Sequence, residues 1–192
     1  MPPSRRRLLH ALAGVTAGLA GCADLADPAV DRPTPGPRGE RVRPLAVVAV
    51  RRKSPDPLVT DEDGDARDAH LTSAEEANEL AFADDDAAAR LAAAVEETDF
   101  ERHSLFLHQQ TVGECYRVHL TEVSRRDDSV HFSFCRELRG ANDACTKGKQ
   151  VRVGYAIRLP FAGDDFSGMG IGFSHGCSPN AADAVRTQGG DG

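Results

Sequence analysis

The chain has 192 residues, of which 40% are hydrophobic and 28% charged, with a formal net charge of −7. Leu, Val, Ile and Phe together number 40, which lies near the lower limit for a globular protein and supports one modest domain rather than two. The acidic balance makes nucleic acid a poor partner, and no apolar run reaches the roughly 18 residues that a membrane-spanning helix needs.

Residues 1–21 have the successive parts of an export signal peptide. The basic segment consists of Arg5, Arg6 and Arg7. A weakly apolar stretch, 11–20, follows it, and paired arginines before such a stretch resemble the twin-arginine export signal. Residues 19–22, Leu-Ala-Gly-Cys, match the lipobox of bacterial and archaeal lipoproteins. We therefore expect cleavage before Cys22 and a lipid on its thiol.

The expected lipid on Cys22 anchors the protein to the membrane, and we expect no other cofactor. Such a cysteine commonly carries two hydrocarbon chains, which anchor stably where a single chain binds only marginally. Removal of residues 1–21 takes away three arginines and no carboxylate, so the net charge of the mature chain is −10. Anionic headgroups repel such a surface. Residues 22–40, rich in Pro and Asp, are expected to be a tether that holds the domain away from the membrane.

The charged residues are unevenly chosen. Arg outnumbers Lys by 20 to 3, and Asp outnumbers Glu by 19 to 11. This bias resembles proteins of halophilic archaea, in which hydrated carboxylates keep the surface soluble. A genome of high GC content explains the excess of Arg over Lys equally well.

Residues 41–162 are predicted to form one α+β domain. A continuous apolar run within 43–50 favours a strand that is covered on both faces. Ser73 and Glu76 form a capping box that predicts a short helix to about residue 81. Asp84 or Asp85 starts a second helix, expected to end near residue 98. Its apolar stripe consists of Ala88, Leu91, Ala92 and Val95.

The rest of this domain is predicted to be β-structure. The strand segments are 104–110, 113–123, 130–135 and 150–159. The last three alternate between apolar and polar residues, which predicts a small antiparallel sheet with one wet face and the helices on the other. Residues 125–129 are the expected turn between the second and third segments. Residues 163–192 contain eight glycines and are expected to be an irregular tail.

Four cysteines remain besides Cys22. They are Cys115, Cys135, Cys145 and Cys177. An even number in an exported domain predicts two disulfides. Our first choice pairs Cys135 with Cys145 and Cys115 with Cys177. The alternative joins Cys115 to Cys135 across a hairpin.

His119 and His131 are the leading candidates for a metal site. Both fall on the polar face of the predicted hairpin. If Leu120 lies opposite Phe132, the two histidines are diagonal neighbours that could share an ion, with His103 and His108 as further candidates. Two solvent-facing histidines are the plainer interpretation of the same pattern.

Other chemical motifs are weaker. Met169, His175 and Cys177 are soft ligands of the kind that copper prefers, but their spacing is unlike that of blue-copper sites. The acidic run 61–65 lacks the later Gly and Glu of a calcium-binding loop. Ser167 and Ser174 are the only hints of a nucleophile, and no phosphate-binding glycine motif is present. We find no catalytic set and expect a protein that is not an enzyme.

An ordered set of short segments resembles a known group of proteins. The segments are 98–101, 104–105, 112–116, 134–136 and 158–160, which read TDFE, SL, VGECY, FCR and RLP. They are similar to small haloarchaeal exported lipoproteins with twin-arginine signals, a group whose function is unassigned, over about residues 70–180. The resemblance implies export and lipidation and transfers no catalytic residue.

The sequence therefore predicts a lipoprotein on the outer face of the cell membrane. We expect a non-catalytic interaction or structural module whose partners are the membrane, through the lipid on Cys22, and another envelope protein. The alternatives are a metal-binding or solute-binding lipoprotein that uses surface histidines, and an extracellular hydrolase with its site in the tail.

Overall fold

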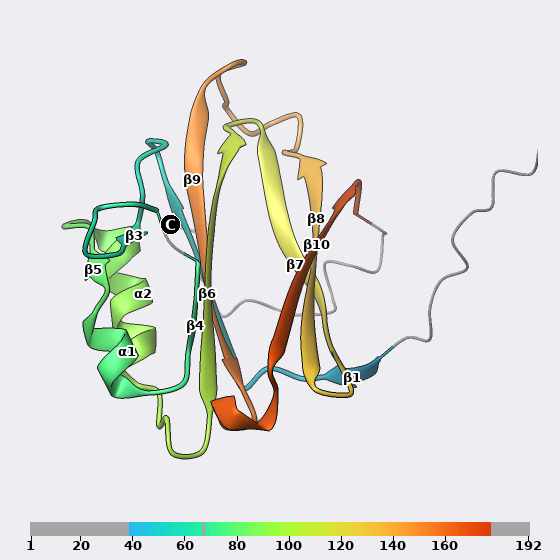
Figure 1. The fold of residues 1–192 in the computed structure, drawn as a ribbon. Coiled ribbons are helices and arrows are strands. Elements are labelled where there is room, and N and C mark those ends of the chain that lie inside the picture. Colours follow the sequence, from blue (N-terminus) through green and yellow to red (C-terminus); the bar gives the residue numbers. More distant parts are fainter. Residues whose placement is uncertain (1–38, 67, 178–192) are drawn as a thin grey trace, which may run out of the picture. The chain divides into compact units, whose positions relative to one another are not determined.

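The computed structural model describes residues 39–66 and 68–177. The predicted signal peptide, Cys22 and nearly all of the predicted tether lie outside the described residues, as does the predicted tail beyond residue 177. The described part is mostly β-structure, with two α-helices on one side (Figure 1).

Two four-stranded sheets form the body of the domain. Sheet A has the order β1 (Glu40–Val42), β7 (Tyr116–Arg126), β8 (Ser129–Leu138) and β10 (Gly168–His175). Sheet B has the order β2 (Ala46–Arg52), β9 (Gln150–Leu159), β6 (Ser104–Gly113) and β4 (Ala69–Leu71). Neighbouring strands are antiparallel except β10, which runs parallel to β8. A small third sheet pairs β3 (Val59–Thr60) with β5 (Ala81–Phe82).

The main hydrophobic core lies between sheets A and B. Sheet A supplies Leu120, Val123, Val130, Phe132 and Phe134. Sheet B supplies Val47, Phe106, Val112, Val151, Val153, Tyr155, Ile157 and Leu159. The alternate apolar residues of β9 thus all point into this core, as their period-two spacing predicts.

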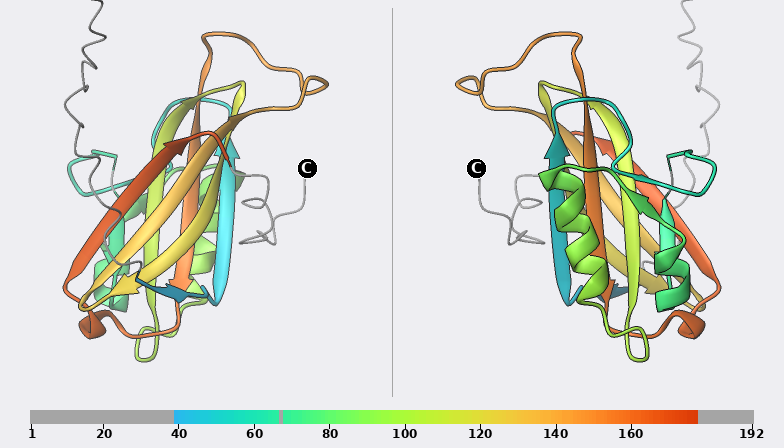
Figure 2. Two further views of the ribbon diagram at one scale, coloured as in Figure 1. Left: turned by 90° about the vertical axis from the view of Figure 1, so that its right-hand side faces the viewer. Right: turned by 90° about the vertical axis from the view of Figure 1, so that its left-hand side faces the viewer.

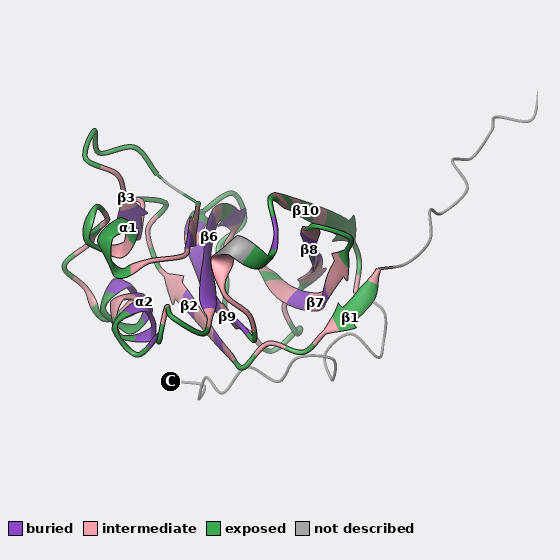
Figure 3. Ribbon diagram, turned by 60° about the horizontal axis from the view of Figure 1, so that its bottom comes forward, coloured by how far each residue is buried: buried purple, intermediate pink, exposed green. Residues whose placement is uncertain are grey.

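A second core lies on the opposite face of sheet B, under helices α1 (Ala74–Asn78) and α2 (Asp86–Glu96) (Figure 2). Ala88, Leu91 and Val95 of α2 are buried there against Leu107 and Ala156 of the sheet. Sheet B is therefore covered on both faces, and its strands are among the most buried in the domain (Figure 3).

The predicted helix starts are confirmed. The Ser73 hydroxyl accepts a hydrogen bond from the amide of Glu76, and Asp85 caps α2 by accepting from the amides of Ala87 and Ala88. The Glu76 carboxylate reaches back to the amide of Thr72, 2.7 Å away, one residue before the expected partner. The N-terminal ends of α1 and α2 therefore depend on local hydrogen bonds that the sequence encodes.

The α+β prediction with one sheet and one wet face is wrong in its arrangement. Strand β9 belongs to sheet B and not to the sheet of β7 and β8, and both of its faces are covered. Its second face carries Arg152, Gly154, Ala156 and Arg158. Arginine, glycine and alanine at alternate positions resemble a solvated face, but here the small residues leave room for α2.

The expected irregular tail is also wrong for residues 163–175. A short 3-10 helix (Gly163–Asp165) leads into β10, which extends sheet A. The domain thus continues past residue 162 to the end of the described residues. Met169, Ile171 and Phe173 of β10 alternate with Gly168, Gly170 and Gly172, so this part of the strand has a period-two pattern with one face nearly without side chains.

Gly154 tests the packing of sheet B against α2. A Cβ atom at this position would lie 2.7 Å from Leu58 Cδ1 and 3.0 Å from Leu91 Cδ1. We expect Gly154→Val to lower the free energy of unfolding by about 1–3 kcal/mol, because overpacking displaces α2. Urea unfolding measures the change. Gly140→Val, in an exposed loop, is the matched control, and equal stability of the two variants would contradict this packing.

Candidate functional site

The free edge of sheet A carries a row of exposed apolar side chains. Met169, Ile171 and Phe173 of β10 are 40%, 37% and 53% exposed. In the parallel register they lie beside Val130, Phe132 and Phe134 of β8, on the face that points toward sheet B. We call these three residues the β10 row. No charged residue interrupts the strand between Gly168 and Ser174.

The main-chain amides of the three residues in the β10 row point away from β8, toward the free edge of the sheet. Gly168 and Gly176, at the two ends of the strand, donate their amides to carbonyls on the β8 side. Because alternate residues of a parallel strand face the same neighbour, the amides of the odd-numbered residues Met169, Ile171 and Phe173 point to the free edge. The row therefore combines exposed apolar surface with unpaired main-chain groups among the described residues.

A buried histidine lies beneath Phe173. His108 of β6 is 5% exposed, and its Nδ1 lies 2.8 Å from Asp68 Oδ2. Its Nε2 has no hydrogen-bond partner among the described residues. The ring of Phe173 lies 5.7 Å from that of His108, and Phe134 lies 5.0 Å from it. Phe173 thus covers a buried polar group from the side of the free edge.

The four predicted cysteines form two disulfides, but the expected pairing is wrong. Cys115 is bonded to Cys145, and Cys135 to Cys177. Neither pair matches the first choice or the cross-hairpin alternative. Cys115 and Cys145 lie in the loops that leave and enter sheet B, whereas Cys135 lies within β8 and meets the chain just after β10. The Cys135–Cys177 pair depends on the β10 strand, which the sequence analysis did not predict.

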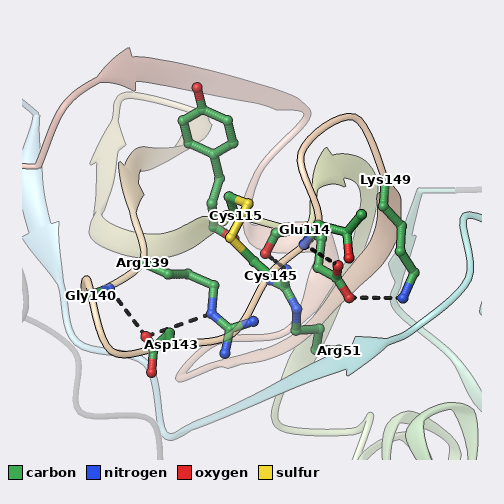
Figure 4. The surroundings of a disulfide bond; sticks show 10 residues. Arg51, Glu114, Cys115, Arg139, Gly140, Asp143, Cys145 and Lys149 are labelled. Carbon is green, nitrogen blue, oxygen red and sulfur yellow. Dashed lines mark hydrogen bonds and ion pairs between the residues drawn. A yellow bond between two sulfur atoms is a disulfide. The ribbon is translucent and has the colours of Figure 1, made fainter.

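The Cys115–Cys145 bond lies in a polar corner (Figure 4). Arg51 donates to the carbonyl oxygens of Glu114 and Tyr116, at 2.6 and 3.0 Å. The Glu114 carboxylate accepts from Lys149 Nζ at 2.9 Å and from the amide of Thr146 at 2.8 Å. These contacts hold the loop between β8 and β9 against the start of β7.

The two predicted metal-binding histidines are separated. Leu120 lies opposite Phe134, and a bulge before Glu122 shifts the register, so that Phe132 lies opposite Val123. His119 is consequently paired with Cys135, while His131 lies opposite Ser124, four residues or about 13 Å away along β8. The predicted register is wrong, and the structure does not bring these histidines together.

His131 instead covers the glycines of β10. A Cβ atom on Gly170 would lie 2.6 Å from His131 Nδ1, and one on Gly172 would lie 2.9 Å from Nε2. The glycine face of β10 is therefore occupied by an imidazole ring from β8.

His119 has a different neighbourhood. Its Nε2 lies 3.0 Å from Glu137 Oε1. One ligand atom each from His119, Glu137 and Cys177 lies within 4.8 Å of the others, with Cys177 in its disulfide. The expected register hid this group, because Leu120 opposite Phe132 would place His119 opposite Ser133, four residues from Glu137.

The remaining sequence candidates do not form sites in the described part of the chain. Ser167 donates to the Asp128 carboxylate, and Ser174 to backbone carbonyls, so neither contacts a histidine. His175 contacts Arg136. Met169 and His175 lie six residues apart on one strand, about 20 Å, which is too far for one copper ion.

Comparison with known protein families, curated proteins and solved structures finds no match for this chain. Two disulfides indicate an oxidising, extracellular environment for the domain. No helix in the described ranges is long and apolar enough to cross a membrane.

The polar corner predicts a pH dependence of stability. Hydrogen bonds from Lys149 and the Thr146 amide lower the pKa of Glu114 from 4.5 to about 2. Because the folded pKa lies below the unfolded value, this carboxylate stabilises the fold above pH 4.5, and the stabilisation is lost as the pH falls toward 2.

We expect Glu114→Gln to be destabilised near neutral pH and to lose less stability than the wild type as the pH falls through this range. Urea unfolding at a series of pH values measures both effects. Glu96→Gln, at an exposed position on α2, controls for the loss of one negative charge. If the unfolding free energy of Glu114→Gln fell with pH as steeply as that of the wild type, the stabilisation assigned to the Glu114 carboxylate would be contradicted.

Proposed function

We propose that this protein is a non-catalytic binding module on the outer face of the cell membrane. A lipid on Cys22 anchors it, the residues up to about 40 tether it, and the domain binds an extended segment of another envelope protein along the free edge of β10. The observation that carries the proposal is the β10 row, three exposed apolar side chains on an uncharged edge strand.

An unprotected edge of this kind favours strand addition. Natural edge strands are usually short, charged, interrupted by proline or bulged, because an open edge pairs with other chains. β1, at the other edge of sheet A, has three residues and carries Glu40 and Arg41. β10 has eight residues and none of these protections before His175. Main-chain hydrogen bonds to an added strand, with pockets for alternate side chains, are a common mode of peptide recognition.

The surface defines the chemistry of the segment that would bind. A strand added to β10 continues two faces: one beside Met169, Ile171 and Phe173, and one beside glycines. The first face favours apolar side chains at every second position of the partner. The second face is already covered by the His131 ring over Gly170 and Gly172, so the apolar face is the one that selects the side chains of the partner.

Two other occupants fit less well. Residues 178–192 contain one Val and no alternating apolar run, so they lack the pattern that the row favours. A second copy of the mature chain also has a net charge of −10, and the repulsion between two chains of like net charge opposes association. A segment of a different protein meets neither objection.

Site-specific crosslinking tests the proposal. A photoreactive side chain at position 171, in protein assembled in its own membranes, is expected to crosslink to one extended segment of another protein, with apolar residues at alternate positions. A synthetic peptide of that segment should compete. The same group at position 138, another exposed apolar site, should not give this product. Crosslinks only between copies, only to residues 178–192, or equally from both positions would contradict the proposal.

A single substitution should remove the interaction. We expect Ile171→Asp to weaken binding of the crosslinked segment by at least about tenfold, because the charge would be desolvated beside an apolar strand. Fluorescence anisotropy of the labelled peptide measures affinity. Leu138→Asp, at a site 67% exposed, should bind like the wild type. Unchanged affinity in Ile171→Asp would contradict the docking site.

The anchor is tested separately. We expect Cys22→Ser to release the protein from membranes into the soluble fraction, because its thiol would carry the only lipid. Fractionation of cells after high-salt washing measures release, and Cys115→Ser is the control for loss of a cysteine elsewhere. Membrane retention of Cys22→Ser would contradict anchoring through this residue.

A further inference from the structure

We propose that Cys135 and Cys177, once reduced, bind Zn²⁺ together with His119 and Glu137. This cysteine pair would then have two alternative states, an oxidised disulfide and a pair of thiolates bound to zinc. The proposal is independent of the binding function of β10.

The four side chains converge at one end of sheet A. His119 lies opposite Cys135 on the β7–β8 pair, and directly opposite residues point to the same face of a sheet. Glu137 is two residues further along β8 and so points to that face as well. Cys177 reaches Cys135 from the end of β10. His119 and Glu137 are partly exposed, which gives an ion access to the group.

The donor atoms suit zinc. Zn²⁺ in proteins takes four nitrogen, sulfur or oxygen ligands at about 2.0–2.3 Å in a tetrahedron, which places neighbouring ligand atoms about 3.3–3.8 Å apart. Here His119 Nε2 and Glu137 Oε1 are 3.0 Å apart, and the Cys177 sulfur lies within 4.8 Å of both. These three residues form the group in the oxidised form, and Cys135, the disulfide partner of Cys177, would supply the fourth ligand once the two sulfurs are free to separate.

The disulfide decides whether the site exists. Metal ligation needs thiolates, which the oxidised pair does not supply. A dithiol reductant transfers two electrons and two protons to the pair: the bond between Cys135 and Cys177 breaks, two thiols form, and the reductant becomes a disulfide. Zinc then displaces the two thiol protons. Oxidation by a disulfide of a partner molecule runs the same exchange backward and releases the ion.

The other disulfide lacks these neighbours. Near Cys115 and Cys145, the Glu114 carboxylate is already bound by Lys149 and by the Thr146 amide, and the guanidinium of Arg51 lies close by (Figure 4). Fixed cations oppose the binding of a dication. The two cysteine pairs therefore provide an internal comparison.

The test uses the full mature chain with Cys22→Ser, Cys115→Ser and Cys145→Ser, which leaves only the two cysteines of the proposed pair. The protein is reduced with a dithiol, freed of reductant without oxygen, and titrated with zinc chloride against a chromophoric chelator. We expect one zinc per chain in the reduced form and none of comparable affinity in the oxidised form. Co²⁺ in place of zinc should show a thiolate charge-transfer band.

Ligand variants decide which residues bind. His119→Ala and Glu137→Gln should each weaken zinc binding by at least about tenfold, since each removes one of four ligands. His131→Ala removes a histidine of β8 that lies outside the proposed group, and this variant should bind zinc like the parent. Equal affinity in His119→Ala and the parent, or no zinc binding by a reduced protein that keeps its circular dichroism, overturns the proposal.

Reduction also removes the stabilisation that the disulfide supplies, so the thermal stability of the reduced protein, with and without zinc, provides a second measurement. Zinc should then raise the Tm of the reduced protein, because a ligand that binds only the folded state stabilises it. His119→Ala should abolish the rise. A Tm of the reduced protein that does not depend on zinc overturns the proposal.

Discussion

The fold depends on covering both faces of sheet B. Only about a fifth of the residues are large and apolar, so the chain forms two thin cores that share one sheet, with sheet A on one side and α2 on the other. Ala156 and Gly154 let α2 approach, while Val153 and Tyr155 fill the space between the sheets. The disulfides add to this limited burial: loops of 30 and 42 residues closed by such bonds are worth about 4 kcal/mol each.

This arrangement leaves sheet A with one face buried and two unlike edges. Its β1 edge is short and charged, whereas the β10 edge is long, uncharged and apolar on the side that faces sheet B. The Cys135–Cys177 bond fastens the end of β10 to β8, and His131 fills the glycine face of the same strand. The strand is thus held in place from within the sheet while its outer backbone groups stay open. A binding role at this edge and a cysteine pair at its end are separate properties of one strand.

Local signals in the sequence predicted the local structure well. Ser73 and Asp85 marked the helix starts, and the alternation in 150–159 identified which side chains enter the core. Long-range relations were not predictable in the same way. Arg152 and Arg158 made β9, which is covered on both faces, resemble a strand with one solvated face. The bulge before Glu122 shifted the pairing of β7 with β8 by one residue. The glycines of β10 suggested an irregular tail, yet Met169, Ile171 and Phe173 at alternate positions carried the signal of a strand. The disulfide pairing and the His119–Glu137 contact both followed from these missed relations.

Hydrogen exchange at the β10 backbone tests the central claim most directly. The amides of Met169, Ile171 and Phe173 point to the free edge, where no other described strand pairs with β10. If an extended segment adds to this edge in the cell envelope, these amides should exchange much more slowly in protein anchored in its own membranes than in purified protein, while exchange in β6 and β9 stays the same. Equal exchange rates at these three amides in both preparations would contradict the account.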